Sequence, residues 1–475
     1  MQIRKFRLHN FGRFESLEAS FMENEITPAK VVVLVGNNGA GKTSILKALA
    51  TSMSWFIGLL RSEKGKGSPI NDDSIREGAA SCAIDIDVHD VAAGQEHFRW
   101  SVARVRQGMN GQHSSVLVDA RVLADDYRSR LTNSDDCSLP LVAYYPVERS
   151  VLEVALKVNK RNAFSQLVGY EDFLSPSVQF TKFFEWFRDR EDQENEIGHQ
   201  ILTSDRKRDQ LERLGELVNA LDSQALDEIT PGDFRSLGKE LAKLQVVMNG
   251  LREISVDPQL SAVRKAIEQF MPGFSNLRVQ RKPRLQLVVD KAGLALNVLQ
   301  LSQGEKTLMA LVGDIARRLA MMNPGLDDPL QGQGVVLIDE VDMHLHPTWQ
   351  REIIRNLTRT FPNCQFILTT HSPLVISDYP DVLVFALNDG QLDRVPSQFG
   401  QDANSVLLDV MDTHVRNPDV GAKLNDALDA IQCGRLSDAK QFIEELDALL
   451  PASNLELAKA KLFLRKQELR LEKNR

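Results

Sequence analysis

One glycine-rich segment has the residue types that hold a nucleotide phosphate: Gly36-Asn37-Asn38-Gly39-Ala40-Gly41-Lys42-Thr43. Its glycines allow several backbone N–H groups to converge on one anion. Lys42 supplies a positive charge for the β- and γ-phosphates, and the Thr43 hydroxyl is a ligand for Mg²⁺. The predicted nucleotide-binding residues of this segment are Asn37, Asn38, Gly39, Ala40, Gly41, Lys42, Thr43 and Ser44.

Two carboxylates follow the apolar run Val335–Ile338. A carboxylate at such a strand end can hold Mg²⁺ through water, and we assign this role to Asp339. Glu340 comes next and is the expected general base, because it can accept a proton from the attacking water. His371 ends the following apolar strand, where it can hydrogen-bond the γ-phosphate. The predicted catalytic residues are Glu340, Lys42 and His371, and the predicted metal ligands are Thr43 and Asp339.

A third segment, Leu301-Ser302-Gln303-Gly304-Glu305, opens a helix whose apolar residues recur at helical spacing. A serine hydroxyl, backbone amides and the helix dipole at this end suit a γ-phosphate, so Ser302, Gln303, Gly304 and Glu305 complete the nucleotide-binding set. His344 and His346 lie in a turn that ends at Pro347, without cysteines nearby. We therefore do not expect them to bind a metal ion.

The elements around these segments are those of an α/β protein. The apolar run Val31–Val35 precedes the glycine turn, and Ser44–Leu49 continues it as a helix. A buried strand that runs through a glycine turn into a helix is the context in which the motif counts as a P-loop. Alternating apolar residues predict antiparallel strands before the P-loop strand and two more over residues 82–88 and 97–102.

Composition excludes several classes of protein. The chain has 475 residues, which permits two or three domains, and its formal net charge is −8, so any nucleic-acid contact must come from a local basic patch. We find no apolar run near the roughly 20 residues that span a bilayer, and no apolar signal segment at the N-terminus. The four cysteines form no C-x-x-C pair and are expected to be reduced thiols in a cytoplasmic protein.

Pattern changes along the chain predict four parts. Residues 1–150 form the N-terminal lobe with the P-loop; 151–275 form a helical insertion with a short hairpin over residues 211–251; 276–400 form the C-terminal lobe; and 401–475 form a helical tail. Its first two helices form a hairpin that cannot bury its own apolar face, so we expect this hairpin to pack on the body or on a partner, and we expect the tail to bind a partner. The cations Arg278, Arg281, Lys282 and Arg284 could touch phosphates, but a charged strand edge is the favoured interpretation.

The order of P-loop, Leu-Ser-x-Gly-Glu, Leu-Ile-Asp-Glu and terminal histidine resembles the ABC ATPases. A helical insertion between the first two is similar to SMC, RecF and Rad50-like members, with a mixed sheet flanked by helices and an antiparallel β subdomain. The resemblance implies a homodimer, or a higher oligomer, in which ATP lies between Gly36–Thr43 of one subunit and Ser302–Glu305 of the other. One departure from this family is that no motif in the sequence identifies the glutamine of a Q-loop.

Three further stretches resemble the AAA_15/AAA_21-type ATPases of prokaryotic defence: Tyr144–Arg149, Glu340–Gln350 and Phe366–Pro373. Size, short insertion and helical tail resemble the PtuA ATPases of Septu anti-phage systems and of some retrons. That likeness implies ATP and Mg²⁺ as cofactors, DNA as a partner, no membrane, and a separately encoded, PtuB-like HNH nuclease. We find neither an HNH pattern nor the acidic strand ends of a TOPRIM module in this chain.

Two other functions are compatible with the motifs. A RecF- or Rad50-like repair ATPase would bind DNA by itself, in a salt-dependent manner, without a dedicated nuclease. An ATP-holding scaffold would assemble on nucleotide with negligible turnover. Substituting Glu340 and Lys42 separately distinguishes a need for hydrolysis from a need for binding alone.

Overall fold

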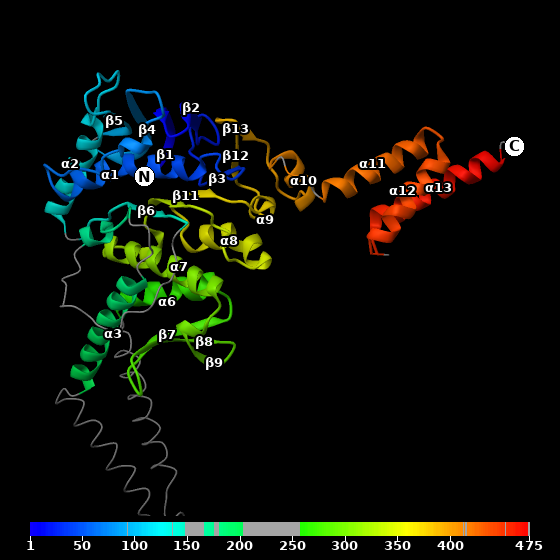
Figure 1. The fold of residues 1–475 in the computed structure, drawn as a ribbon. Helices are drawn as coiled ribbons and strands as arrows, with labels where there is room; N and C mark the ends of the chain where they lie inside the picture. The colour runs from blue at the N-terminus through cyan, green and yellow to red at the C-terminus, as the bar shows by residue number, and fades with distance from the viewer. Residues whose placement is uncertain are drawn as a thin grey trace, which may run out of the picture. The chain divides into compact units, whose positions relative to one another are not determined.

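The computed structural model describes residues 1–92, 94–134, 136–147, 166–174, 180–202, 257–411, 413, 416–451 and 453–473. They form two compact units, Met1–Gly400 and Gln401–Arg475 (Figure 1). The predicted hairpin over residues 211–251 lies outside the described residues, as do Glu148 and Arg149 of the Tyr144–Arg149 stretch.

A six-stranded sheet forms the centre of the first unit, in the order β13-β12-β3-β11-β10-β6. Its strands are β13 (Gln391–Val395), β12 (Leu383–Asn388), β3 (Val31–Gly36), β11 (Cys364–Thr369), β10 (Gly334–Ile338) and β6 (Leu141–Tyr145). The strands from β12 to β6 run parallel, and β13 pairs antiparallel with β12. Every residue of β3, β6, β10 and β11 is buried, as expected for parallel strands that are covered on both faces.

A second, antiparallel sheet lies on one side of the first, in the order β2-β1-β4-β5. It contains β1 (Gln2–Phe11), β2 (Phe14–Ser20), β4 (Ser81–Ala92) and β5 (Gln95–Val105). Helix α1 (Lys42–Arg61) contacts both sheets, and the indole N–H of Trp100 donates to the carbonyl oxygen of Ser52, 3.1 Å away. Helix α1 is long and apolar enough to span a membrane. However, 67% of its apolar stretch is buried inside the protein, as is usual for a core helix.

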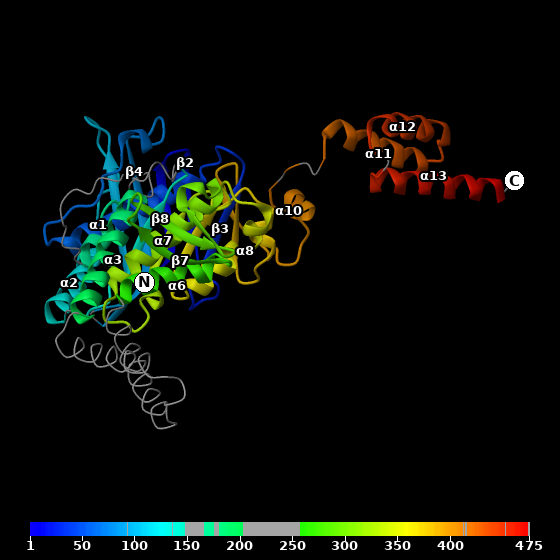
Figure 2. The ribbon, with the colours of Figure 1, turned by 90° about the horizontal axis from the view of Figure 1, so that it is seen from below.

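Helices cover the other face of the central sheet (Figures 1 and 2). They are α7 (Gln303–Met322) and α8 (Pro347–Thr360). Helices α6 (Pro258–Phe270) and α3 (Phe180–Leu202) pack on α7 and on the first strand of the three-stranded sheet of β7 (Phe274–Gln280), β8 (Gln286–Lys291) and β9 (Leu294–Asn297). Helix α3 joins this lobe through Glu191, which pairs with Arg264 and Arg281 at 3.2 Å each. The other elements among the described residues of this unit are η1 (Asp72–Ser74), α2 (Val118–Asn133), η2 (Gln166–Tyr170), η4 (Val298–Gln300), η5 (Pro329–Gln331) and α9 (Pro373–Ser377).

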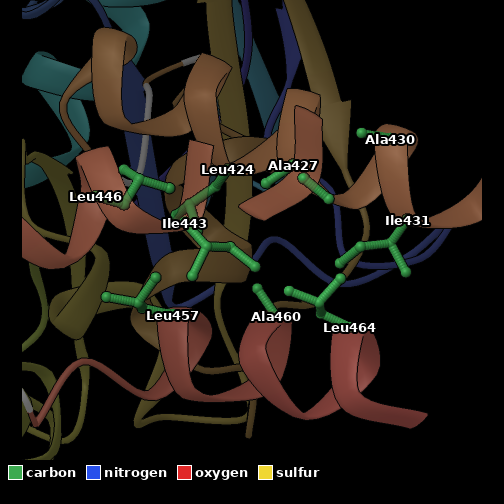
Figure 3. Packing of buried hydrophobic residues seen from close by; sticks show 10 residues of the cluster. Leu424, Ala427, Ala430, Ile431, Ile443, Leu446, Leu457, Ala460 and Leu464 are labelled. Atoms are coloured by element: carbon green, nitrogen blue, oxygen red, sulfur yellow. The ribbon is translucent and has the colours of Figure 1, made fainter. Parts of the chain in front are cut away.

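The C-terminal unit contains α10 (Ala403–Asp409), α11 (Pro418–Gln432), α12 (Leu436–Leu449) and α13 (Leu455–Lys473). The prediction that the hairpin of α11 and α12 must pack on the body or on a partner is wrong. Helix α13 packs across both, and its Leu457, Ala460 and Leu464 join Leu424 and Leu446 in one buried cluster (Figure 3). The third helix therefore covers the apolar face that two helices leave open.

The predicted fold class is confirmed: a mixed α/β sheet flanked by helices, an antiparallel β subdomain and a helical C-terminal region. The sequence patterns did not predict α2, whose apolar spacing is weak, or β9. Helix α6 precedes the expected lobe boundary at residue 276, yet it packs against α7 and α8. Arg278 pairs with Asp290 and Arg281 with Asp192, so these two cations of the basic cluster already have acidic partners.

Candidate functional site

The P-loop forms the turn between β3 and α1. Gly36 has φ 151° and Gly41 has φ 110°, conformations that side-chain-bearing residues rarely adopt. A Cβ atom at Gly36 would lie 2.6 Å from the carbonyl oxygen of Leu387, and one at Gly41 would lie 2.6 Å from the ring of Phe14. Backbone geometry and packing therefore both require glycine at these two positions. Asn37, Asn38 and Gly39 are exposed at the tip of the turn, Ala40 is buried, and Thr43 and Ser44 are half-buried in the first turn of α1.

The first turn of α1 is open to an anion. Its N-cap residue is Gly41, no side chain caps the turn, and it carries no acidic residue. Free N–H groups and the positive end of the helix dipole therefore face the P-loop, which fits a phosphate.

Lys42 is buried, with 6% of its surface exposed. Its Nζ donates to the carbonyl oxygens of Gly36, at 2.7 Å, and Asn37, at 3.2 Å. Burial lowers the pKa of Lys42, while the charges of Asp339 and Glu340 oppose this shift. The ammonium group therefore lies over the loop, where phosphate oxygens can replace these two carbonyl oxygens as its hydrogen-bond acceptors.

Asp339 and Glu340 follow β10, next to the end of β11. The Thr369 hydroxyl donates to Oδ1 of Asp339 at 2.5 Å and accepts the backbone N–H of Glu340 at 2.7 Å. Asp339 and Thr369 are fully buried, and Glu340 has a left-handed φ of 44°. Strained backbone of this kind is common where a side chain must be aimed at a site. One hydroxyl therefore orients the predicted metal ligand and the residue that carries the predicted base.

We expect Thr369→Val to slow ATP hydrolysis by about 10- to 100-fold, because hydrogen bonds to charged groups contribute roughly 1.5–3 kcal/mol. Nucleotide affinity should change less, since Lys42 and the P-loop remain intact. Thr369→Ser keeps the hydroxyl and should retain most of the rate. Steady-state hydrolysis rates of the wild type, Thr369→Val and Thr369→Ser measure this effect. A Thr369→Ser protein that hydrolyses ATP more slowly than Thr369→Val would contradict the prediction.

His371 follows the same strand end. His371 is exposed, but its partial desolvation lowers its pKa, the charge of Lys42 lowers it further, and the charges of Glu340, Asp342 and Asp339 raise it. Lys42 and the three carboxylates therefore lie close enough to His371 for their charges to shift its pKa. Asp342 accepts from the Thr370 hydroxyl and, at 3.3 Å, from the backbone N–H of His371, which ties the turn after Glu340 to the histidine.

The segment Ser302–Glu305 begins α7. Ser302 is its N-cap: the hydroxyl accepts the N–H of Glu305 at 3.3 Å, and the Glu305 carboxylate accepts the N–H of Ser302 at 3.0 Å. Glu305 is also paired with Lys291 at 2.6 Å. A Cβ atom at Gly304 would lie 2.5 Å from the carbonyl oxygen of His344. Ser302 and Gln303 are exposed, so the tip of this helix is available to a second molecule.

The structure thus gathers Lys42, Asp339, Glu340 and His371 at one site, on the carboxyl-terminal side of the parallel strands, where ligands bind in α/β sheets. No hydrogen bond or ion pair among the described residues joins Ser302 or Gln303 to the P-loop. His346 caps α8 by accepting the N–H of Thr348 at 3.4 Å, which gives it a structural role.

Two side chains at this site, those of Asp339 and Thr43, have the oxygen atoms that Mg²⁺ prefers as ligands. Among the described residues, no group of three or more His, Cys, Asp or Glu side chains surrounds a metal position. Mg²⁺ that is held by substrate phosphates and water needs only one or two protein oxygens, and Asp339 and Thr43 can supply them.

The sequence patterns did not predict three residues of the site: Thr369, Asp342 and Arg13. A polar residue at the end of an apolar strand, such as Thr369, is a signal that could have been used. Arg13 lies in the turn between β1 and β2 and donates to the carbonyl oxygen of Gly39. That contact joins two segments through the tertiary fold, so no local pattern indicates it.

Comparisons with known proteins show the family of this chain. Residues 31–377 match the family described as "AAA domain, putative AbiEii toxin, Type IV TA system", and residues 1–58 match "AAA ATPase domain". The chain is similar to the retron Ec83 probable ATPase of Escherichia coli, with 34% identity over 408 residues, 83% of this chain and 73% of that protein. It is 38% identical to the Septu protein PtuA of Bacillus mycoides (strain KBAB4) over 113 residues, 22% of this chain and 15% of PtuA.

Among solved structures, the SMC head bound to the C-winged helix domain of ScpA is similar over 83% of this chain and 97% of that chain. The two are 15% identical, with a TM-score of 0.43.

Proposed function

Because this chain belongs to the AAA_21 family of ATPase domains, we propose that it binds ATP between two copies of itself, hydrolyses it, and acts in anti-phage defence. The resemblance to AAA_15/AAA_21 ATPases and to PtuA, predicted from the motifs, is confirmed by these matches. Family membership and the ATPase-named relatives support ATPase activity. The observation that carries the proposal is the site that unites Lys42, Asp339, Glu340 and His371 beside an uncapped helix end.

The residues have distinct roles in this proposal. The P-loop amides and Lys42 bind the phosphates, and Thr43 and Asp339 would hold Mg²⁺, which would supply charge neutralisation. Glu340 accepts the proton of the attacking water. His371 hydrogen-bonds the γ-phosphate. Desolvation and Lys42 favour its neutral form, in which one ring nitrogen donates and the other accepts.

The dimer completes the site. Ser302 and Gln303 are exposed at an N-terminus whose dipole favours an anion, and no described contact supplies them with a phosphate-binding partner in the same chain. A second copy can present this helix end to the nucleotide on the P-loop. ATP then favours the dimer by its differential affinity for the closed arrangement.

We expect Ser302→Asp to abolish ATP-dependent dimerisation while ATP binding to the single subunit stays within about twofold. Aspartate is as good an N-cap as serine, so α7 remains capped, but its charge repels the γ-phosphate of the other subunit. Analytical ultracentrifugation with and without ATP measures the effect, with Ser302→Thr as the control that keeps the hydroxyl. A Ser302→Asp protein that dimerises normally with ATP would argue against a site shared between subunits.

The partner in this proposal is a separately encoded HNH nuclease, which the ATPase controls, and DNA is the target. The support is the similarity to a retron ATPase and to PtuA. A phage-challenge assay of the native gene cluster tests it, with in-frame deletions of this gene and of its neighbour. Protection should be lost in each of the two deletion strains. Protection that persists in both strains would overturn the defence role.

A further inference from the structure

A buried polar cluster joins the predicted metal carboxylate to the helix that begins at Ser302. The backbone carbonyl of Tyr145, the last residue of β6, accepts the N–H of Asp339 at 2.8 Å. The phenol of Tyr145 donates to Oδ2 of Asp314, 2.9 Å away, within α7. One residue therefore contacts both the end of β10 and the middle of α7.

Asp314 is the centre of this cluster. Arg317 donates to its Oδ1 at 2.6 Å and Arg318 to its Oδ2 at 2.7 Å. Burial alone would raise the pKa of Asp314, but the charges of Arg318 and Arg317 hold it far below the usual range, so the group is a carboxylate. Arg318 also donates to the carbonyl oxygen of Gly169 at 2.6 Å. The exposed fractions are 3% for Tyr145, 4% for Asp314, 5% for Arg317 and 7% for Arg318.

The phenol of Tyr145 connects this ionic cluster to β6, the strand whose last carbonyl accepts the N–H of Asp339. Arg317 and Arg318 lie on α7 itself, and Gly169 lies in η2. The two arginines satisfy Asp314 without the tyrosine. Removal of the phenol oxygen should therefore leave the carboxylate paired and the helix folded and packed on β6, while it removes the hydrogen bond that joins Asp314 to that strand.

We propose that Tyr145 is a positioning residue whose hydrogen bond to Asp314 couples the two ATP sites of the dimer. This inference rests on the proposed function, in which Asp339 of a chain serves one ATP and Ser302 of the same chain serves the other. Ser302 and Asp314 lie on one helix, about three turns apart. A movement of α7 when Ser302 meets its phosphate is transmitted through the phenol to β6 and to Asp339, because packed helices shift as units.

The chain offers a matched control in Tyr127. Its phenol also donates to a buried carboxylate, Oδ2 of Asp90, at the same distance of 2.9 Å. The exposed fractions of Tyr127 and Asp90 are 5% and 6%. This pair joins α2 to β4, and neither residue belongs to α7 or to the strand end that carries Asp339. Tyr127→Phe therefore removes an equivalent hydrogen bond with no expected effect on coupling.

The test is the rate of ATP hydrolysis as a function of ATP concentration for the wild-type full chain, Tyr145→Phe and Tyr127→Phe. We expect Hill coefficients clearly above 1 for the wild type and Tyr127→Phe, and about 1 for Tyr145→Phe, with maximal rates within about threefold. A wild-type Hill coefficient in Tyr145→Phe overturns the inference. An equal loss in Tyr127→Phe also overturns it, since the effect would then follow from lost stability rather than from the link.

Sedimentation of the same proteins with ATP separates the two proposals. If the wild-type chain forms no ATP-dependent dimer, the proposed function fails and the coupling fails with it. If the dimer forms but hydrolysis is non-cooperative, or if Tyr145→Phe behaves like Tyr127→Phe, the coupling alone fails.

Discussion

Lys42→Ala should abolish ATP binding at millimolar nucleotide and, with it, hydrolysis and ATP-dependent dimerisation. The lysine is the one P-loop side chain that brings a positive charge to the phosphates, and its Nζ already lies over the carbonyl oxygens of Gly36 and Asn37. In a partly desolvated site, removal of one partner of a charge-assisted hydrogen bond costs several kcal/mol. Isothermal titration calorimetry with ATP and Mg²⁺ measures the loss directly.

The matched control for this change is Lys47→Ala. Lys47 is exposed on the same helix, so its loss changes the net charge equally without touching the P-loop. We expect wild-type affinity for this variant. Equal weakening by both substitutions would mean that the overall charge of α1, and not the placed ammonium group, governs binding.

Glu340→Gln should lower the hydrolysis rate by about 10²- to 10⁴-fold, the usual contribution of a general base. Glutamine has nearly the same shape but cannot accept the proton of the attacking water. Binding should survive, because Lys42, Thr43 and Asp339 are unchanged, so the variant should accumulate as an ATP-bound dimer. Single-turnover hydrolysis and size-exclusion chromatography with ATP measure the two effects, and Glu352→Gln on α8 is the control.

The pair of variants also decides between hydrolysis and assembly as the essential step. If protection in cells survives Glu340→Gln but is lost in Lys42→Ala, nucleotide binding suffices and the chain acts as a scaffold. If both substitutions leave protection intact, ATP is not central to the function. Salt-sensitive DNA binding by the chain alone would instead favour the repair ATPase.

The parts of the site that could be predicted are those whose chemistry is contiguous in the sequence. A glycine turn between a buried strand and a helix already contains its anion site, so the P-loop needed no tertiary information. The same holds for Ser302, since an N-cap serine followed three residues later by glutamate indicates a helix start. The predicted strands around these motifs correspond to observed strands because apolar alternation is strong there.

What could not be predicted depends on the order of strands in the sheet. Strand β10 lies between β11 and β6, which are far from each other in the chain, and only this order brings Thr369 and Tyr145 to the two sides of Asp339. Periodicity gives the faces of a strand but not its neighbours. The cover that α13 provides for the α11–α12 hairpin was missed for a similar reason, because the apolar spacing of α13 does not say which helices it meets.

The central claim, a site built from two copies of the chain, can be tested by cysteine cross-linking between Ser302→Cys and Asn38→Cys, both at exposed positions. The two proteins are mixed in a Cys137→Ser, Cys433→Ser background, which leaves only the two buried native cysteines. With a short bifunctional maleimide we expect a covalent dimer with ATP, and none without ATP or when Lys42→Ala is added to the Asn38→Cys chain. Equal cross-linking with and without ATP, or none under any condition, would contradict the account.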